Sequence, residues 1–310
     1  MILAACRREF SGFPATPAFG TIQIMFVPSD ALDELAFAFR CYVYFRWHTH
    51  RRRPLAALER LAAGDLQAIH PEIHILELSA SEAEIALLAS LQPTESVSTA
   101  ASKLKGAASK KLRELQGLDQ PTTILGGGYF AATFGDNTSS ELDRYLEHQG
   151  EHHGYASRVR SPVWVQAWPV TQADWAALQT AHAVTILRWH LVISTWNRQG
   201  VFTREAGRCL CDAWHRQSAA WRIRLSKVSV LPDHIHIAAW SHPTVAPGQL
   251  VLGFMSTSSE LIVADFPHLL IEAKVPRLWK PGAYVGTYGD IRKAAVRDYL
   301  RSWESRGPEA

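Results

Sequence analysis

The fold of this 310-residue chain is decided by residues 231–240, which read Leu-Pro-Asp-His-Ile-His-Ile-Ala-Ala-Trp. In a β-strand alternate side chains point to opposite faces, so His234 and His236 share one face while Ile235 and Ile237 take the other. Neutral imidazole is a common ligand of divalent cations, and a strand holds two of them at a fixed separation. The pattern predicts a metal or phosphate site, although His-x-His alone more often marks the polar face of a half-buried strand.

The two halves of the chain repeat one another. Residues 128–136 read Gly-Tyr-Phe-Ala-Ala-Thr-Phe-Gly-Asp and align without gaps with residues 282–290, Gly-Ala-Tyr-Val-Gly-Thr-Tyr-Gly-Asp. Tyr145 and Tyr299 follow at the same spacing. Each half also has the strand and helix order of a ferredoxin-like unit. We therefore predict an α+β protein of two tandem ferredoxin-like (RRM-like) modules with antiparallel sheets, forming an intramolecular pseudo-dimer.

Hydrophobic periodicity places the elements of each half. In the first half we expect strands at 36–48, 72–78 and 129–134, and helices at 54–63, 81–91, 95–115 and 139–149. In the second half strands at 189–196, 223–230 and 283–288 join the His-x-His strand, with helices at 203–219, between 247 and 273, and at 291–303. The predicted domains are an N-terminal extension (1–35), a first module (36–150), an apolar, packed linker (151–184) and a second module (185–310).

Composition indicates a globular protein, with 47% hydrophobic and 20% charged residues. The net charge of +3 permits nucleic-acid binding without requiring it. Four cysteines without a Cys-x-x-Cys pair, and the lack of a signal segment or membrane-spanning run, lead us to expect a reduced, cytoplasmic protein. Two basic clusters are candidates for phosphate contact, with a solvated face as the alternative: Arg51, Arg52 and Arg53, and Lys103, Lys105, Lys110 and Lys111.

The motif Pro-Asp-His-Ile-His-Ile is followed by Leu-Trp-x-x-Gly at 278–282 and then by a predicted helix with a tyrosine. This pattern resembles the HUH single-tyrosine transposases of small bacterial insertion sequences and their REP-associated relatives. The resemblance covers nearly all of the chain from about Ala36, once per half. It implies that two histidines and a glutamine hold Mg²⁺ or Mn²⁺, and that a helical tyrosine attacks a phosphodiester of single-stranded DNA.

Neither half carries the full set of family residues. Aligning residues 73–75 with 235–237 puts Glu72 opposite His234, with His74 opposite His236. Tyr145 has Gln149 four residues later, on the same helix face, whereas Tyr299 has Trp303. Family members are homodimers in which the tyrosine helix of one subunit can complete the histidine strand of the other. The resemblance therefore implies one crosswise site, with Tyr145 as nucleophile and His234, His236 and Gln149 as metal ligands, and one decayed site with Glu72, His74 and Tyr299.

A same-half site is the alternative, because Glu72 is a good ligand for a hard metal ion and could act with His74, Tyr145 and Gln149. The expected function is a metal-dependent single-stranded DNA endonuclease and strand transferase that forms a 5′-phosphotyrosine. A domesticated hairpin-DNA-binding protein with vestigial catalysis is a second hypothesis. A replication-initiator nickase is weaker, because the chain has no Gly-x-x-x-x-Gly-Lys loop. The expected partner is single-stranded or hairpin DNA, with no membrane, and the protein is expected to be a monomer.

Overall fold

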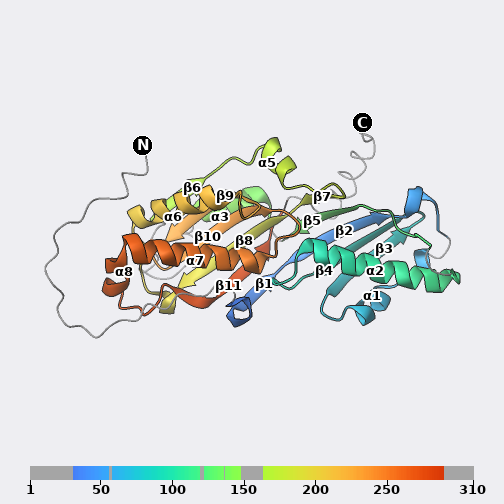
Figure 1. The fold of residues 1–310 in the computed structure, drawn as a ribbon, viewed down its shortest axis with the longest axis horizontal. Helices are drawn as coiled ribbons and strands as arrows, with labels where there is room; N and C mark the ends of the chain where they lie inside the picture. Colours follow the sequence, from blue (N-terminus) through green and yellow to red (C-terminus); the bar gives the residue numbers. More distant parts are fainter. Residues whose placement is uncertain (1–30, 56–57, 119–121, 136, 148–162, 290–310) are drawn as a thin grey trace.

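The computed structural model describes residues 31–55, 58–118, 122–135, 137–147 and 163–289. These residues form two β-sheets arranged along the long axis of the molecule (Figure 1). The six-stranded sheet has the order β1 (Ala36–Arg40), β11 (Trp279–Thr287), β8 (Arg188–Thr195), β10 (His234–Ser241), β9 (Ile223–Leu231) and β6 (Trp164–Ala167). The five-stranded sheet has the order β3 (His74–Ser81), β4 (Glu84–Ser90), β2 (Tyr42–His48), β5 (Tyr129–Phe134) and β7 (Ala183–Ile186).

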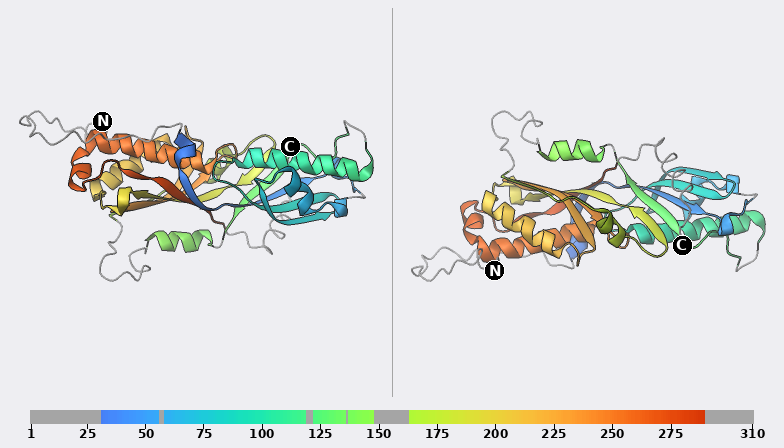
Figure 2. Two further views of the ribbon diagram at one scale, coloured as in Figure 1. Left: turned by 90° about the horizontal axis from the view of Figure 1, so that it is seen from below. Right: turned by 90° about the horizontal axis from the view of Figure 1, so that it is seen from above.

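Long helices cover the same side of both sheets, and α3 lies on the opposite side of the six-stranded sheet (Figure 2). Among the described helices, none combines the length and apolarity that crossing a membrane requires. The helices are α1 (Ala63–Ile69), α2 (Val97–Gln116), α3 (Ser139–Glu147), α5 (Gln172–Ala177), α6 (Arg204–Gln217), α7 (Pro247–Asp265) and α8 (Pro267–Glu272). Short 3₁₀ turns are η1 (Ala31–Glu34), η2 (His50–Arg52), η3 (Leu58–Arg60) and η4 (Trp196–Arg198).

The strand and helix order is the same in the two halves. The first half runs β2, α1, β3, β4, α2, β5, and the second half runs β8, α6, β9, β10, α7, α8, β11. Local sequence signals set the helix limits: the Ser96 hydroxyl accepts a hydrogen bond from the Thr99 amide at the start of α2, and Gly117, in the left-handed region at φ 62°, ends it. The repeat seen in the sequence is therefore a repeat of α+β units.

Two predicted helices of the first half are wrong. Residues 81–91 contain the strand β4, in which Ile85, Leu87 and Ala89 are buried at a period of two. Ala, Leu and Glu favour a helix there, but pairing with β2 and β3 on either side overrides this local propensity. The described residues between 54 and 62 form only the η3 turn, and the helix that follows begins at Ala63. The predicted helix 291–303 lies outside the described residues.

The sheets are mixed and not purely antiparallel, because each half donates a strand to the other. β1 pairs in parallel with β11, and β7 pairs in parallel with β5. Only Cys41 separates β1 from β2, and only Leu187 separates β7 from β8. One nearly continuous strand of each half therefore crosses from one sheet to the other. The described part of the predicted linker is packed, because it also supplies β6 to the edge of the six-stranded sheet.

Glycines of the repeated motif lie where the halves cross. A Cβ on Gly135 would lie 2.1 Å from the carbonyl oxygen of Thr287, and one on Gly289 would lie 2.8 Å from that of Thr133. Any side chain at either position would force the crossing strands apart. The close approach explains why both halves have a glycine there.

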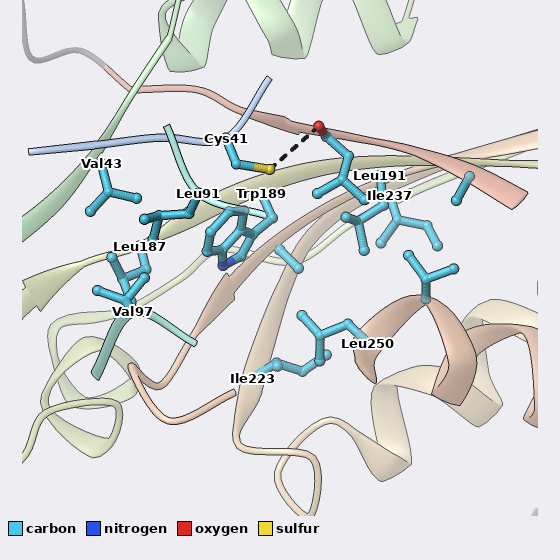
Figure 3. Close-up of a cluster of buried hydrophobic side chains, with 14 of the residues drawn as sticks. Cys41, Val43, Leu91, Val97, Leu187, Trp189, Leu191, Ile223, Ile237 and Leu250 are labelled. Atoms are coloured by element: carbon cyan, nitrogen blue, oxygen red, sulfur yellow. Dashed lines mark hydrogen bonds between the residues drawn. The ribbon is translucent and has the colours of Figure 1, made fainter. Parts of the chain in front are cut away.

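The core is continuous across the two halves. Figure 3 shows Cys41 and Val43 packed near Leu187 and Trp189 of the second half, with the Cys41 thiol 3.6 Å from the Val285 carbonyl oxygen. Burial raises the pKa of Cys41 to about 12, so this side chain is a packing thiol and not a nucleophile. Burial of apolar surface contributes about 25 cal/mol per Å² to stability, so this shared core stabilises the two halves as one unit.

Candidate active site

The histidine pair lies on β10 as the alternation predicts. Ile235 and Ile237 are fully buried in the core beneath the helices, and His234 and His236 point to the other face of the sheet. Their ring centroids are 4.9 Å apart. The two side chains are 7% and 5% exposed, which is too buried for a solvated polar face. Buried polar groups need partners, so the contacts of each ring decide what the pair can do.

Asp233 orients His234. Its Oδ1 lies 2.6 Å from His234 Nδ1, and its Oδ2 accepts from Arg198 Nε at 2.9 Å. Burial raises the pKa of Asp233, but the hydrogen bond to His234 and the charge of Arg198 outweigh it, so the net shift is downward. An ionised carboxylate on Nδ1 leaves Nε2 of His234 as the nitrogen for an external ligand.

His190, which the sequence did not single out, orients His236 in the same way. It lies on the neighbouring strand β8, and its Nε2 is 3.0 Å from His236 Nδ1, with the rings stacked at 5.2 Å. Burial lowers the pKa of His190 to about 4, so its ring is neutral at pH 7. Its Nε2 can then accept a hydrogen bond from the Nδ1–H group of His236. Strand pairing could have revealed this contact. His190 on β8 is the diagonal neighbour of His236 on β10, and diagonal neighbours on paired strands share a face of the sheet.

Tyr145 of the first half lies over the histidines of the second half. Its ring centroid is 5.6 Å from that of His236 and 6.3 Å from that of His190. Burial raises the pKa of the Tyr145 phenol, so the hydroxyl is protonated at neutral pH. The structure therefore brings Tyr145, His234 and His236 together.

Helix α3 is docked on the six-stranded sheet by an apolar face and by an ion pair. Leu142 and Leu146 are buried in a small cluster with Ala238 and Tyr288, and Tyr145 packs against this cluster. At the polar edge, Lys227 of β9 forms an ion pair with Glu147 at 2.7 Å. These contacts hold the tyrosine helix of one half against the sheet of the other.

The structure corrects the predicted decayed site. β4 corresponds to β10, since each lies beside the first strand of its half and forms a hairpin with the preceding strand. Glu84 and Ala86 therefore replace His234 and His236. The alignment through Glu72 and His74 was wrong, because these residues lead into β3, the counterpart of β9. Glu72 instead forms an ion pair with Lys103 at 3.2 Å, and its Oε1 lies 3.3 Å from Nδ1 of His70.

Other predicted residues have varied environments. Arg51, Arg52 and Arg53 are exposed near η2, and Lys110 is exposed on α2. The remaining predicted lysines have contacts within the first half: Lys103 with Glu95 at 3.1 Å, Lys111 with Asp65 at 3.0 Å, and Lys105 with the Gly127 carbonyl at 3.1 Å. Gln149 and Tyr299 lie outside the described residues.

The residues present fit a divalent cation in part. Both histidines have Nδ1 engaged by a neighbour, which is the usual arrangement behind a ligating Nε2. Within the described ranges, no group of three or more His, Cys, Asp or Glu side chains could hold a metal ion.

A histidine pair on a central strand beneath a helical tyrosine defines the class of HUH single-tyrosine DNA-cleaving and joining enzymes. A family model described as "Transposase IS200 like" matches residues 39–149 and 183–302, one segment in each half. The chain therefore belongs to the IS200-like transposases, as a tandem duplication of the family segment.

A curated protein and a solved structure, both from Deinococcus radiodurans, are similar to part of the chain. The ISDra2 transposase TnpA is 23% identical over 116 residues, which are 37% of this chain and 83% of that protein. A solved structure described as a transposase from the same organism is 24% identical, with a TM-score of 0.32, and covers 37% of this chain and 89% of its own.

Proposed function

We propose that this transposase cleaves and joins single-stranded DNA at one composite site, in a metal-dependent reaction. Tyr145 of the first half supplies the nucleophile, and His234 and His236 of the second half supply metal ligands. The observation that carries the proposal is the 5.6 Å separation of the Tyr145 and His236 rings. In this proposal the halves act as two ferredoxin-like modules of an intramolecular pseudo-dimer, so a monomer suffices.

Mg²⁺ or Mn²⁺ would be held by Nε2 of His234 and His236, with Gln149 as a further ligand and a DNA phosphate completing the set. The ion would polarise the scissile phosphate and reduce its charge. Asp233 and His190 fix the orientation of the two imidazoles. Because these ligands carry no charge, metal affinity without DNA is expected to be weak.

The reaction transfers the phosphoryl group from the DNA 3′ oxygen to Tyr145. The phenolic oxygen forms a bond to phosphorus, the bond to the 3′ oxygen breaks, and the phenolic proton is transferred, in net terms, to the released 3′-hydroxyl. The product is a 5′-phosphotyrosine. Packing of Tyr145 against Leu142 and Leu146 limits the access of water to this ester. Attack by a 3′-hydroxyl reverses the step and joins strands without another energy source.

The first half supports an alternative. Ala86 offers no metal ligand at the position of His236, so the duplication has lost one of its two sites. The second candidate function is therefore binding of hairpin DNA without cleavage. Tight hairpin binding without any covalent product at millimolar Mg²⁺ or Mn²⁺ would favour that alternative.

The test uses single-stranded DNA carrying the sequences that flank the gene. With Mg²⁺ or Mn²⁺, wild-type protein is expected to form a covalent adduct that denaturing electrophoresis resolves. The adduct should disappear in Tyr145→Phe and persist in Tyr299→Phe, the matched change in the other tyrosine. The reverse result would overturn the composite site. Light scattering should give the mass of one chain in the active species.

A further inference from the structure

A cavity of about 490 Å³ lies in the first half, apart from the composite site. It is bordered by the end of β2, the η2 turn, the start of β5 and residues 180–184 before and within β7. Its volume is in the range of pockets that hold one or two nucleotide units. The side chains around it are mainly basic and aromatic, and they include Arg46, His48, Arg51, Arg52 and Phe130.

The inner wall of this cavity lies on the sheet face that corresponds to the histidine face of the other half. Arg46 is the strand neighbour of Ala86, just as Val192 is the neighbour of His236. Arg46 is 8% exposed, and its guanidinium donates to Glu84 at 3.3 Å and lies 6.0 Å from the centroid of the Phe130 ring. Glu84 is also 3.7 Å from His48. A fixed arginine therefore stands beside the positions that correspond to His234 and His236.

The rim of the cavity carries two further arginines in a constrained turn. Arg51 and Arg52 have φ values of 54° and 52°, and the matching turn of the second half has Asn197 at 50° and Arg198 at 56°. Arg198 is bound by Asp233, but the first half has Ala83 at the position of that aspartate. The rim therefore lacks the carboxylate that engages the arginine in the other half.

We propose that this cavity binds a segment of single-stranded DNA without a metal ion and without cleaving it. Arg46, Arg51 and Arg52 contact backbone phosphates, and a base stacks near Phe130. Glu84 orients Arg46 and offsets part of its charge, so the rim arginines supply most of the attraction. The inference rests on the proposed function, because the strand held here belongs to the same DNA that Tyr145 attacks.

The probe is a fluorescein-labelled oligothymidylate of about eight nucleotides, which is within the size range of single-strand sites and forms no hairpin. Fluorescence anisotropy is measured on the full chain in EDTA. Wild-type protein is expected to bind, and Arg51→Asn/Arg52→Asn should weaken binding about tenfold or more and reduce the slope of log K against log salt by about 1.4, because each phosphate contact on a single strand contributes about 0.7. Asparagine suits this turn, because Asn197 occupies the position that matches Arg51 and asparagine tolerates the left-handed backbone at both positions.

A second variant tests the inner wall. Arg46→Gln/Glu84→Gln removes both charges and leaves neither partner buried alone, so the fold is kept while affinity falls. Arg208→Gln on α6, an exposed arginine of the other half, is the matched control and should bind as wild type does. An abasic oligonucleotide of the same length should bind several-fold more weakly, because it has no base to stack.

Failure of this proposal is distinguishable from failure of the proposed function. Wild-type affinity in both arginine variants, or loss of binding in EDTA, overturns the cavity proposal even where Tyr145 forms its adduct. Equal binding of the abasic strand also overturns it, because the cavity would then attract only charge. Weaker binding in the arginine variants supports the cavity proposal even in a protein that forms no covalent adduct.

Discussion

Glu147 of α3 and Lys227 of β9 form an ion pair of 2.7 Å that joins the tyrosine helix of the first half to the sheet of the second half. The Lys227 side chain is only 7% exposed and also lies 3.6 Å from Asp143, whereas Glu147 is 53% exposed. The buried partner is thus the lysine. Loss of the Lys227 ammonium removes a contact that docks α3, and it leaves no buried charge because Glu147 is exposed to solvent.

We therefore expect Lys227→Met to slow adduct formation about fivefold, which corresponds to about 1 kcal/mol in the docking of α3. Methionine keeps the aliphatic volume, so the denaturation midpoint should change little. The measurement is the single-turnover rate of adduct formation. Glu147→Gln should show a smaller effect, and the two changes should be less than additive when combined. Additive effects would show that the ion pair does not dock the helix.

Removing the partner of His236 should weaken metal binding. His190→Leu leaves Nδ1 of His236 without its bond at 3.0 Å, and loss of such a partner commonly costs about 10- to 100-fold in metal affinity. Titration of Mn²⁺ in the presence of uncleavable DNA, followed by electron paramagnetic resonance, measures this directly. His190→Gln retains an acceptor and should recover part of the affinity. Equal losses in both variants would mean that His190 only fills space.

The candidate site shows what the sequence could and could not predict. The alternation of residues 234–237 is enough to place both histidines on one face, and the structure has them there. The crosswise approach of Tyr145 to His236 agrees with the expectation drawn from the family resemblance, while their chemical roles stay a prediction. His190 was not predicted, because its contact with His236 depends on the pairing of β8 with β10 and not on spacing along the chain.

The fold of the first half shows the same limit. Residues 84–90 favour a helix by composition, and only their position between β2 and β3 makes them a strand. That error placed the decayed histidines at Glu72 and His74 instead of Glu84 and Ala86. The exchange of β1 and β7 between sheets was also missed, since parallel pairing over long sequence separations leaves no local pattern.

The crossing of the two halves depends on two matched threonines. The Thr133 hydroxyl accepts from the Arg188 amide at 2.9 Å and donates to the Tyr288 carbonyl at 3.0 Å. The Thr287 hydroxyl accepts from the Tyr42 amide at 3.0 Å in the same way. Thr133→Val should lower the free energy of unfolding by about 1–3 kcal/mol, because a buried amide loses its partner. Urea denaturation measures the change, and Thr133→Ser should restore most of it; a serine variant as unstable as valine would assign the loss to packing.

The linker between the halves should make stability depend on pH through Asp174. This carboxylate accepts hydrogen bonds from the Thr171 hydroxyl at 2.7 Å and amide at 3.0 Å, and from Arg224 Nε of β9 at 2.7 Å. The Thr171 hydroxyl, then the Thr171 amide, then Arg224 lower the pKa of Asp174 from 3.8 to about 2. Because the folded state has the lower pKa, the stabilisation is full above about pH 4 and is lost as the pH falls toward 2.

Asp174→Asn should therefore cost about 1 kcal/mol at pH 7, a value kept low because the carboxylate is partly solvated. At pH 3 the difference between variant and wild type should shrink to about half, since the unfolded wild-type carboxylate is by then mostly protonated. Urea midpoints at the two pH values, with equal slopes, give both differences. Other carboxylates titrate in both proteins and cancel from the comparison. If the difference in unfolding free energy between wild type and Asp174→Asn stays constant from pH 7 to pH 3, the asparagine destabilises the protein for steric reasons. The charge of Asp174 would then not hold α5 to β9.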